Sequence, residues 1–336
     1  MEYLQTGKLG SSFLAELLGT IRCADEQVVV GPGIGEDAAV LDIGGRYLIV
    51  KSDPITFAHD RIGWYAVNVN ANDIASMGGT PRWFLVTMLL PEGRTTTALI
   101  RDIMNDLNES CGELGVALVG GHTEVTPGLP HPILSGTMLG EVTPGGLIRA
   151  GGVRPGDLLY ITRRAAIEGT SIIARERPGE VAGAFGEEFY RRCVEFLTEP
   201  GISVVADARL ARESANLSGM HDPTEGGVLA GAWEMAAGSG VGLDLYPDRV
   251  PVYPETARLC AHYGLNPLGL IASGSLLLSA DSGEAEKLER SFREHRGPAH
   301  LTRIGELTGS GRMYLVEGGR RREYTPTGRD EINKLL

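Results

Sequence analysis

Apolar positions in the first half of the chain alternate between strand-like and helix-like periods. Two short apolar runs around a Gly-Gly pair predict a β-hairpin, Ala38–Asp42 with Arg46–Lys51. A helix is expected over Ile62–Met77, because a second Gly-Gly pair and a proline follow it. The other elements expected here are strands at Trp83–Leu90, Val116–Val119 and Ile133–Val142 and an amphipathic helix at Thr95–Cys111.

The second half shows the same mixture after a stretch rich in Gly, Pro and Arg, Pro144–Gly156. We expect strands at Asp157–Thr162 and Val241–Leu245. The expected helices are Ala166–Glu176, Glu187–Glu195, Ser203–Ser214 and Thr224–Ala237. The predicted fold class is therefore mixed α/β (α+β), with one domain over residues 1–150 and another over 151–336.

Composition and charge narrow the class of protein. A length of 336 residues fits two domains, and 42% hydrophobic residues suffice for their cores. The net charge of −12 argues against nucleic acid as a partner, since phosphate backbones require basic patches. The four cysteines stand far apart, so neither a zinc site nor a disulfide framework is expected. No signal-like start and no apolar run of about 18 residues occurs, so we expect a cytoplasmic protein without membrane contact.

Two acidic segments flank the expected hairpin strands. Gly31–Asp37 is no dinucleotide fingerprint, because such a loop follows a strand and opens a helix, whereas this one precedes a strand. It is either a loop that delivers Glu36 and Asp37 to a phosphate or metal, or an ordinary solvated turn. Asp53 is expected at a strand end, where a carboxylate can hold Mg²⁺. A turn aspartate before a proline is the alternative.

Polar residues crowd the expected helix Ile62–Met77. Asn and Asp are poor helix formers because their side chains compete for backbone hydrogen bonds. Asn68, Asn70, Asn72 and Asp73 nevertheless lie among alanine, valine and isoleucine. So many polar groups require a ligand, a metal or a buried network, and we favour contact with a ligand.

A glycine pair, Gly120-Gly121, is expected to end a strand and let a backbone approach phosphates. His122 and Glu124 follow it and are candidate ligands or proton carriers. An incidental surface turn is the alternative.

Another glycine pair, Gly226-Gly227, follows a capping-box pattern with Asp222 as N-cap and Glu225 at the third helical position. Glycines there imply a close approach, either by a packed neighbour or by an anion at the helix N-terminus. Together with Asp37, Asp53 and Asp73, which lie at edges of regular elements, these loops are typical of a Mg²⁺-assisted nucleotide site between two domains.

The order of these motifs resembles the aminoimidazole ribonucleotide (AIR) synthetase superfamily. The segments that carry the resemblance are Gly35–Val40, Lys51–Asp53, Asn72–Gly78, Gly120–Thr123 and Asp222–Gly227. Within the superfamily, the chain is most similar to the hydrogenase-maturation (HypE) proteins and their AIR synthase-related cousins, over about residues 7–317. The resemblance implies a PurM-like fold of two α/β domains and a homodimer in which the N-terminal mixed sheets join into a barrel.

The resemblance also implies ATP and Mg²⁺ as cofactors and transfer of the γ-phosphoryl group to an oxygen of a small or carrier-bound acceptor. Asp37, Asp53 and Asp73 would hold the metal. The candidate catalytic residues are Asp73, Lys51 and His122. The candidate nucleotide-binding residues are Glu36, Asp37, Asp53, Asn72, Asp73, Gly120, Gly121, Asp222, Thr224, Gly226 and Gly227.

Two departures from the family pattern keep other functions open. HypE proteins end in a cysteine, whereas the last cysteine here is Cys260. The Gly-Gly pair of HypE and of the thiamine-phosphate kinases continues with Asp, whereas this chain has His122, so a metal-binding carboxylate is missing or Glu124 replaces it. The alternatives are a HypE-type dehydratase with a maturation partner, a thiamine-phosphate kinase-like enzyme, or a non-catalytic ATP-binding scaffold.

Overall fold

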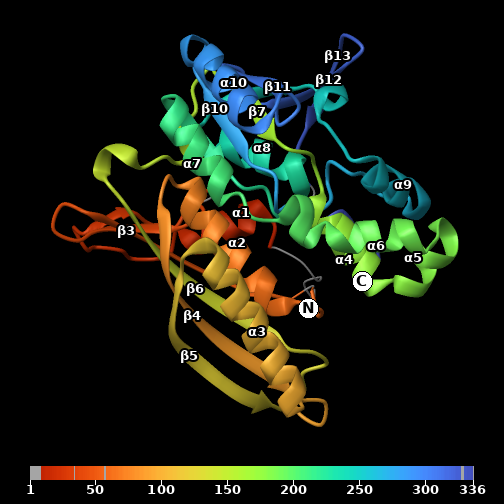
Figure 1. The fold of residues 1–336 in the computed structure, drawn as a ribbon. Coiled ribbons are helices and arrows are strands. Elements are labelled where there is room, and N and C mark those ends of the chain that lie inside the picture. The colour runs from red at the N-terminus through yellow and green to blue at the C-terminus, as the bar shows by residue number, and fades with distance from the viewer. Residues whose placement is uncertain (1–8, 34, 57, 327–328, 336) are drawn as a thin grey trace. The chain divides into compact units, whose positions relative to one another are not determined.

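The computed structural model describes residues 9–33, 35–56, 58–326 and 329–335, which form two compact units (Figure 1). The N-terminal unit comprises residues 25–31 and 37–147. The C-terminal unit comprises the described residues of 1–24, 32–36 and 148–336. Among the described residues, none of the helices combines the length and hydropathy that a membrane span requires.

The N-terminal unit contains a six-stranded mixed sheet with the order β1-β2-β3-β6-β4-β5. Its strands are β1 (Val28–Val30), β2 (Ala39–Asp42), β3 (Tyr47–Ile55), β4 (Thr80–Pro91), β5 (Ala117–Thr126) and β6 (Ile133–Val142). All neighbours pair antiparallel except β4 and β5, which are parallel. Asp42 pairs with Tyr47, which confirms the predicted hairpin.

Two helices of this unit, α2 (Ile62–Ser76) and α3 (Thr97–Leu114), pack against each other beside the sheet (Figure 1). The burial of β6 alternates strictly along the strand, as expected for a strand with one face on the core. Helix α2 contacts β3, β4, β6 and α3, so all of its residues are buried. Its polar side chains therefore lie inside the unit, where each needs a hydrogen-bonding partner.

The C-terminal unit contains a seven-stranded sheet with the order β13-β12-β9-β11-β7-β10-β8, in which only the pair β12 and β9 is parallel. Its strands are β7 (Leu158–Thr162), β8 (Leu217–His221), β9 (Gly242–Leu245), β10 (Leu277–Ala280), β11 (Leu301–Thr308), β12 (Met313–Glu317) and β13 (Arg320–Tyr324). Helix α8 (Gly227–Gly238) packs on β8, β9 and β10 and contributes to the apolar core.

The described part of this unit contains seven further helices. They are α1 (Ser11–Leu18), α4 (Ile167–Glu176), α5 (Pro178–Phe185), α6 (Glu187–Glu195), α7 (Val205–Ser214), α9 (Pro254–Tyr263) and α10 (Ser282–Arg296). Of these, α4, α5, α6 and α9 lie together on one side (Figure 1). Short 3-10 helices occupy Pro144–Gly146, Ala150–Gly152, Pro247–Arg249 and Glu331–Lys334, and a π-helical turn occupies Leu197–Gly201. Helices α4, α6 and α9 contact one another, and α7 packs on α10.

Two strands of the N-terminal unit run further than the sequence pattern predicted. Strand β3 continues past Lys51 through Asp53, because β6 pairs with it as far as Ile55. Strand β5 continues past Val119, because β4 pairs with it as far as Thr126. The predicted ends of both strands were therefore wrong, and Asp53 lies within a strand rather than at its end.

Candidate functional site

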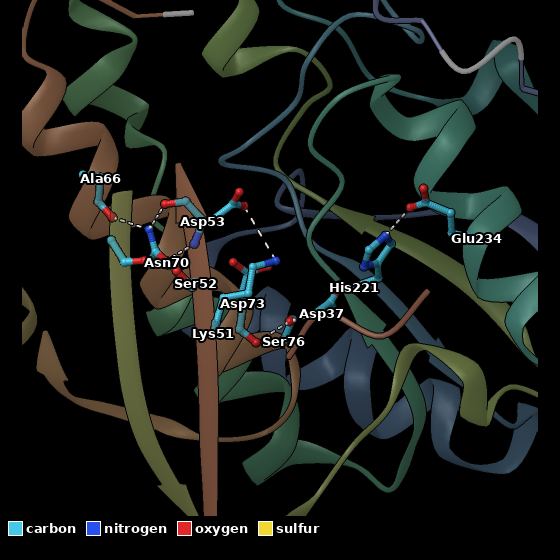
Figure 2. A network of polar contacts seen from close by, with 11 residues as sticks. Asp37, Lys51, Ser52, Asp53, Ala66, Asn70, Asp73, Ser76, His221 and Glu234 are labelled. Atoms are coloured by element: carbon cyan, nitrogen blue, oxygen red, sulfur yellow. Dashed lines mark hydrogen bonds and ion pairs between the residues drawn. The ribbon is translucent and has the colours of Figure 1, made fainter. Parts of the chain in front are cut away.

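Three aspartates and one lysine from separate elements of the N-terminal unit lie close together (Figure 2). Asp73 belongs to the last turn of α2, Lys51 and Asp53 to β3, and Asp37 to the segment before β2. Lys51 Nζ lies 3.2 Å from Asp73 Oδ1 and 3.7 Å from Asp53 Oδ2. Ser76 Oγ donates to Asp37 Oδ2 at 3.0 Å and lies 2.9 Å from the carbonyl oxygen of Asp73. The tertiary structure thus gathers the three aspartates that the sequence singled out.

The chemistry of these side chains fits a hard divalent cation. Asp73 is 4% exposed and Asp37 is 9% exposed. The four side chains carry three negative charges and one positive charge, and buried charges require compensation. Carboxylate oxygens are the ligands that Mg²⁺ prefers. The described residues therefore suit a magnesium ion that would offset the excess negative charge.

Two asparagines of α2 belong to a buried network. Asn70 Oδ1 accepts a hydrogen bond from the backbone N–H of Asp53 at 3.1 Å, and Asn70 Nδ2 lies 3.2 Å from the Asp53 carbonyl oxygen (Figure 2). Asn68 Nδ2 donates to Ser110 Oγ at 2.8 Å and so joins α2 to α3. The sequence favoured contact of these asparagines with a ligand. For Asn68 and Asn70 the structure shows the alternative, a buried hydrogen-bonding network. Asn72, on the same helix, is also completely buried.

Gly120 and Gly121 lie inside β5, so the predicted strand-ending turn at this position was wrong. A Cβ atom on Gly121 would lie 1.9 Å from the carbonyl oxygen of Val86 on β4, so only glycine permits this approach of the two strands. His122 Nε2 lies 3.1 Å from Glu124 Oε2, and both side chains are exposed. This hydrogen bond lowers the pKa of Glu124.

The predicted capping box before α8 was also wrong. The helix begins at Gly227 with Gly226 as its N-cap residue, and Asp222 lies four residues earlier in the preceding segment. A Cβ atom on Gly227 would lie 2.6 Å from the carbonyl oxygens of both Leu268 and Leu270. The packed backbone of residues 268–270 therefore explains why glycine occupies this position.

Other polar residues of the C-terminal unit form pairs. Arg149 Nε lies 3.1 Å from Glu36 Oε1, and this hydrogen bond raises the pKa of Arg149. His221 Nε2 lies 2.9 Å from Glu234 Oε2 (Figure 2). His221 is 6% exposed, and its position directly before Asp222 is the one signal in the sequence that pointed to it. Asp222 is itself buried, and the nearby Thr224 is partly buried.

Glu168, a buried acid of α4, lies outside every motif that pointed to function in the sequence. It is 4% exposed, and Glu168 Oε2 accepts a hydrogen bond from the backbone N–H of Ser273 at 3.2 Å. Burial raises the pKa of Glu168 to about 8, with smaller upward contributions from the charges of Glu225 and Asp330. Such a shift marks a carboxyl group that is mostly protonated in the folded protein at neutral pH.

Models of one protein family match both halves of the chain. The N-terminal domain of AIR synthase related proteins matches residues 35–142, and the C-terminal domain matches residues 154–317. The chain belongs to the AIR synthase-related family. Its two sheets of mixed strand direction have the PurM-like arrangement of that family, as predicted.

The proteins similar to this chain carry names for different activities. A protein of Methanocaldococcus jannaschii named for hydrogenase expression or formation is 27% identical, over 95% of this chain and 95% of its own. The carbamoyl dehydratase HypE of Cupriavidus necator is 27% identical, over 84% of this chain and 79% of its own. A selenide, water dikinase of Trichlorobacter lovleyi is 30% identical, over 83% of this chain and 78% of its own.

Several solved structures share the fold of this chain. HypE of E. coli matches with a TM-score of 0.75 and 21% identity, over 97% of this chain and 98% of that one. A HypE protein in complex with ATP matches with a TM-score of 0.67 and 22% identity, over 92% of this chain and 89% of that one.

Proposed function

We propose that this AIR synthase-related protein is a Mg²⁺- and ATP-dependent enzyme that phosphorylates an oxygen of a small or carrier-bound acceptor. The observation that carries the proposal is the cluster of Asp37, Asp53 and Asp73 around Lys51 and Ser76. Two relatives support it, since one is named a dikinase and another with this fold was solved with ATP.

In this proposal Asp37, Asp53 and Asp73 hold Mg²⁺, whose charge would neutralise that of the transferred phosphoryl group. The Lys51 ammonium, placed 3.2 Å from Asp73, offsets phosphate charge on the same side of β3. His122, hydrogen-bonded to Glu124, is the proposed proton carrier. The proposed contacts to the nucleotide come from Glu36, Asn72, Gly120, Gly121, Asp222, Thr224, Gly226 and Gly227.

Calorimetric titration of ATP, with and without Mg²⁺, tests the site. We expect Mg²⁺-dependent binding in the wild type and at least about tenfold weaker binding in Asp73→Asn, about 1.4 kcal/mol, because a buried metal ligand is lost. Asp42→Asn on β2 is the matched control, since Asp42 Oδ1 accepts an exposed hydrogen bond from the backbone N–H of Gly45. Equal affinities of wild type and Asp73→Asn would refute the assignment.

The reaction is tested by supplying candidate acceptors and following ADP release. Phosphorylation adds a phosphoryl group to the acceptor, and mass spectrometry detects it. The names of the hydrogenase-related relatives favour a second function, carbamoyl dehydration, in which a carrier-bound carboxamide loses the elements of water. Binding of ATP without release of ADP under any acceptor would instead support a non-catalytic scaffold.

We further propose that the chain acts as a homodimer and that a maturation protein is its partner if the second function holds. The proposed domains are 1–150 for the metal-binding half and 151–336 for the other half. A HypE protein that shares the fold of this chain was solved in complex with HypF, which supports such a partner.

A further inference from the structure

Asp330 connects the N-terminus of α8 to a segment that is distant in sequence. Asp330 Oδ2 accepts a hydrogen bond from the backbone N–H of Gly226 at 2.6 Å. Asp330 Oδ1 accepts another from the backbone N–H of Ile332 at 2.7 Å. Asp330 is 5% exposed and Ile332 is completely buried, so water cannot easily replace these contacts.

The neighbouring residue strengthens the same connection. Glu331 N–H donates to the carbonyl oxygen of Gly269 at 3.2 Å, and Glu331 Oε2 accepts from the backbone N–H of Asn266 at 2.9 Å. The backbone N–H of Leu229 on α8 donates to the carbonyl oxygen of Leu268 at 3.0 Å. Residues 330–332, residues 266–269 and the first turn of α8 are therefore joined by hydrogen bonds within the C-terminal unit.

The carboxylate of Asp330 occupies a position that suits an anion. The first N–H groups of a helix lack partners within the helix and carry partial positive charge, so they bind phosphates and carboxylates. The N–H of Gly226, the N-cap residue of α8, already donates to Asp330. A side chain of the protein thus fills this position and holds Gly226, the residue at which the segment Asp222–Gly227 meets α8.

We propose that Asp330 is a positioning residue, which holds the segment Asp222–Gly227 in the conformation that meets the nucleotide or its acceptor. This inference rests on the proposed function and adds a residue outside every motif that suggested it. Burial raises the pKa of Asp330 to about 6, and the Glu225 charge also raises it. Asp330 is accordingly ionised at neutral pH, where hydrogen bonds to a carboxylate are stronger than neutral ones.

Hydrogen exchange of the protein without ligand tests whether Asp330 holds this segment. Asp330→Asn replaces one of the two accepting carboxylate oxygens with an amide NH₂ group, which cannot accept a hydrogen bond. We therefore expect about tenfold faster exchange at the backbone amides of residues 226–230. Asp281→Asn is the matched control, because Asp281 Oδ1 accepts an exposed N–H bond from Gly283 at the start of α10. Equal exchange in the two variants would overturn the inference.

Titration of Mg²⁺·ATP into the same variants tests positioning. We expect about tenfold weaker binding for Asp330→Asn and unchanged binding for Asp281→Asn. The comparison is made between variants that have the same melting temperature. If Asp330→Asn does not fold, Asp330→Ser replaces it, since a serine oxygen can still accept from Ile332 N–H. Normal binding by the Asp330 variant overturns the inference alone. Absence of binding in the wild type overturns the proposed function, and the inference with it.

Discussion

Neighbouring polar residues on α2 have different roles despite their similar chemistry. Asn70 uses its amide to hold the backbone of Asp53, whereas Asp73, one turn further along, lies beside Lys51. The amide side chain can both donate and accept, so it suits two backbone groups of one strand. The carboxylate only accepts, so it suits cations. Residue type therefore separates a structural asparagine from a candidate ligand once the partners are known.

At the residue scale, Glu168→Gln should change how stability depends on pH. The pKa of Glu168 is about 8 in the folded protein, above the ordinary glutamate value of 4.5, so the folded state binds an extra proton between these values. The contribution of Glu168 to the free energy of unfolding is fully present below about pH 4.5 and is lost as the pH rises through about 8. The slope of the free energy of unfolding against pH reaches at most about 1.4 kcal/mol per pH unit, because a single proton is involved.

Urea unfolding at pH 5, 7 and 9 measures this effect. Glutamine is neutral at every pH, so the wild type should lose stability relative to Glu168→Gln as the pH rises. Glu188→Gln, at an exposed position on α6, is the control and should track the wild type. A constant difference between wild type and Glu168→Gln across the three pH values would contradict the raised pKa.

At the scale of elements, strand length depends on pairing partners. Strands β3 and β5 continue through polar and glycine residues because β6 and β4 supply backbone partners as far as Ile55 and Thr126. Glycine is disfavoured in strands in general. It is required at Gly121, where the backbone of β4 leaves no room for a Cβ atom.

Gly121→Ala should therefore destabilise the N-terminal unit much more than Gly120→Ala. Both glycines have a φ of 147°, so backbone strain is matched between the variants. A Cβ atom on Gly120 meets no atom within 4 Å, whereas one on Gly121 meets the Val86 carbonyl oxygen. In denaturant unfolding, we expect Gly121→Ala to lose about 1–3 kcal/mol more of the free energy of unfolding than Gly120→Ala. Equal losses would show that β4 moves away without cost.

At the scale of the whole molecule, the exposed strand β5 bears on association with another chain. It forms one edge of the six-stranded sheet, and its side chains are mostly exposed. Val119 and Val125 of this strand are 52% and 55% exposed. Unpaired strand edges with apolar side chains favour pairing with another chain, and identical edges pair through a two-fold axis.

We therefore expect the protein to form a dimer that Val125→Lys weakens at least about tenfold, because a lysine must leave water to enter the contact. Light scattering over a range of concentrations measures it. Ile43→Lys, at an exposed apolar position between β2 and β3, is the control and should leave the dimer intact. A wild type that stays monomeric at high concentration would contradict the expectation.

The sequence by itself determined the elements whose signals are local. Helices α2 and α3 and strand β6 lie where periodicity and helix-ending residues predicted them, within a few positions. The motifs around Asp37, Asp53 and Asp73 identified the family and the candidate ligands. The division of the chain at residue 150 stays a prediction.

Only the tertiary structure decided where strands end and what caps α8. The residues that prolong β3 and β5 find their partners on other strands, and Gly226 and Asp330 are 104 positions apart. A backbone N–H donates to whichever acceptor the fold brings close to it. An acceptor that is distant in sequence therefore cannot be predicted from the local sequence. The proximity of Asp53 and Asp73 to Lys51, and of Asp37 to Ser76, has the same origin, since it depends on the packing of α2 against the sheet.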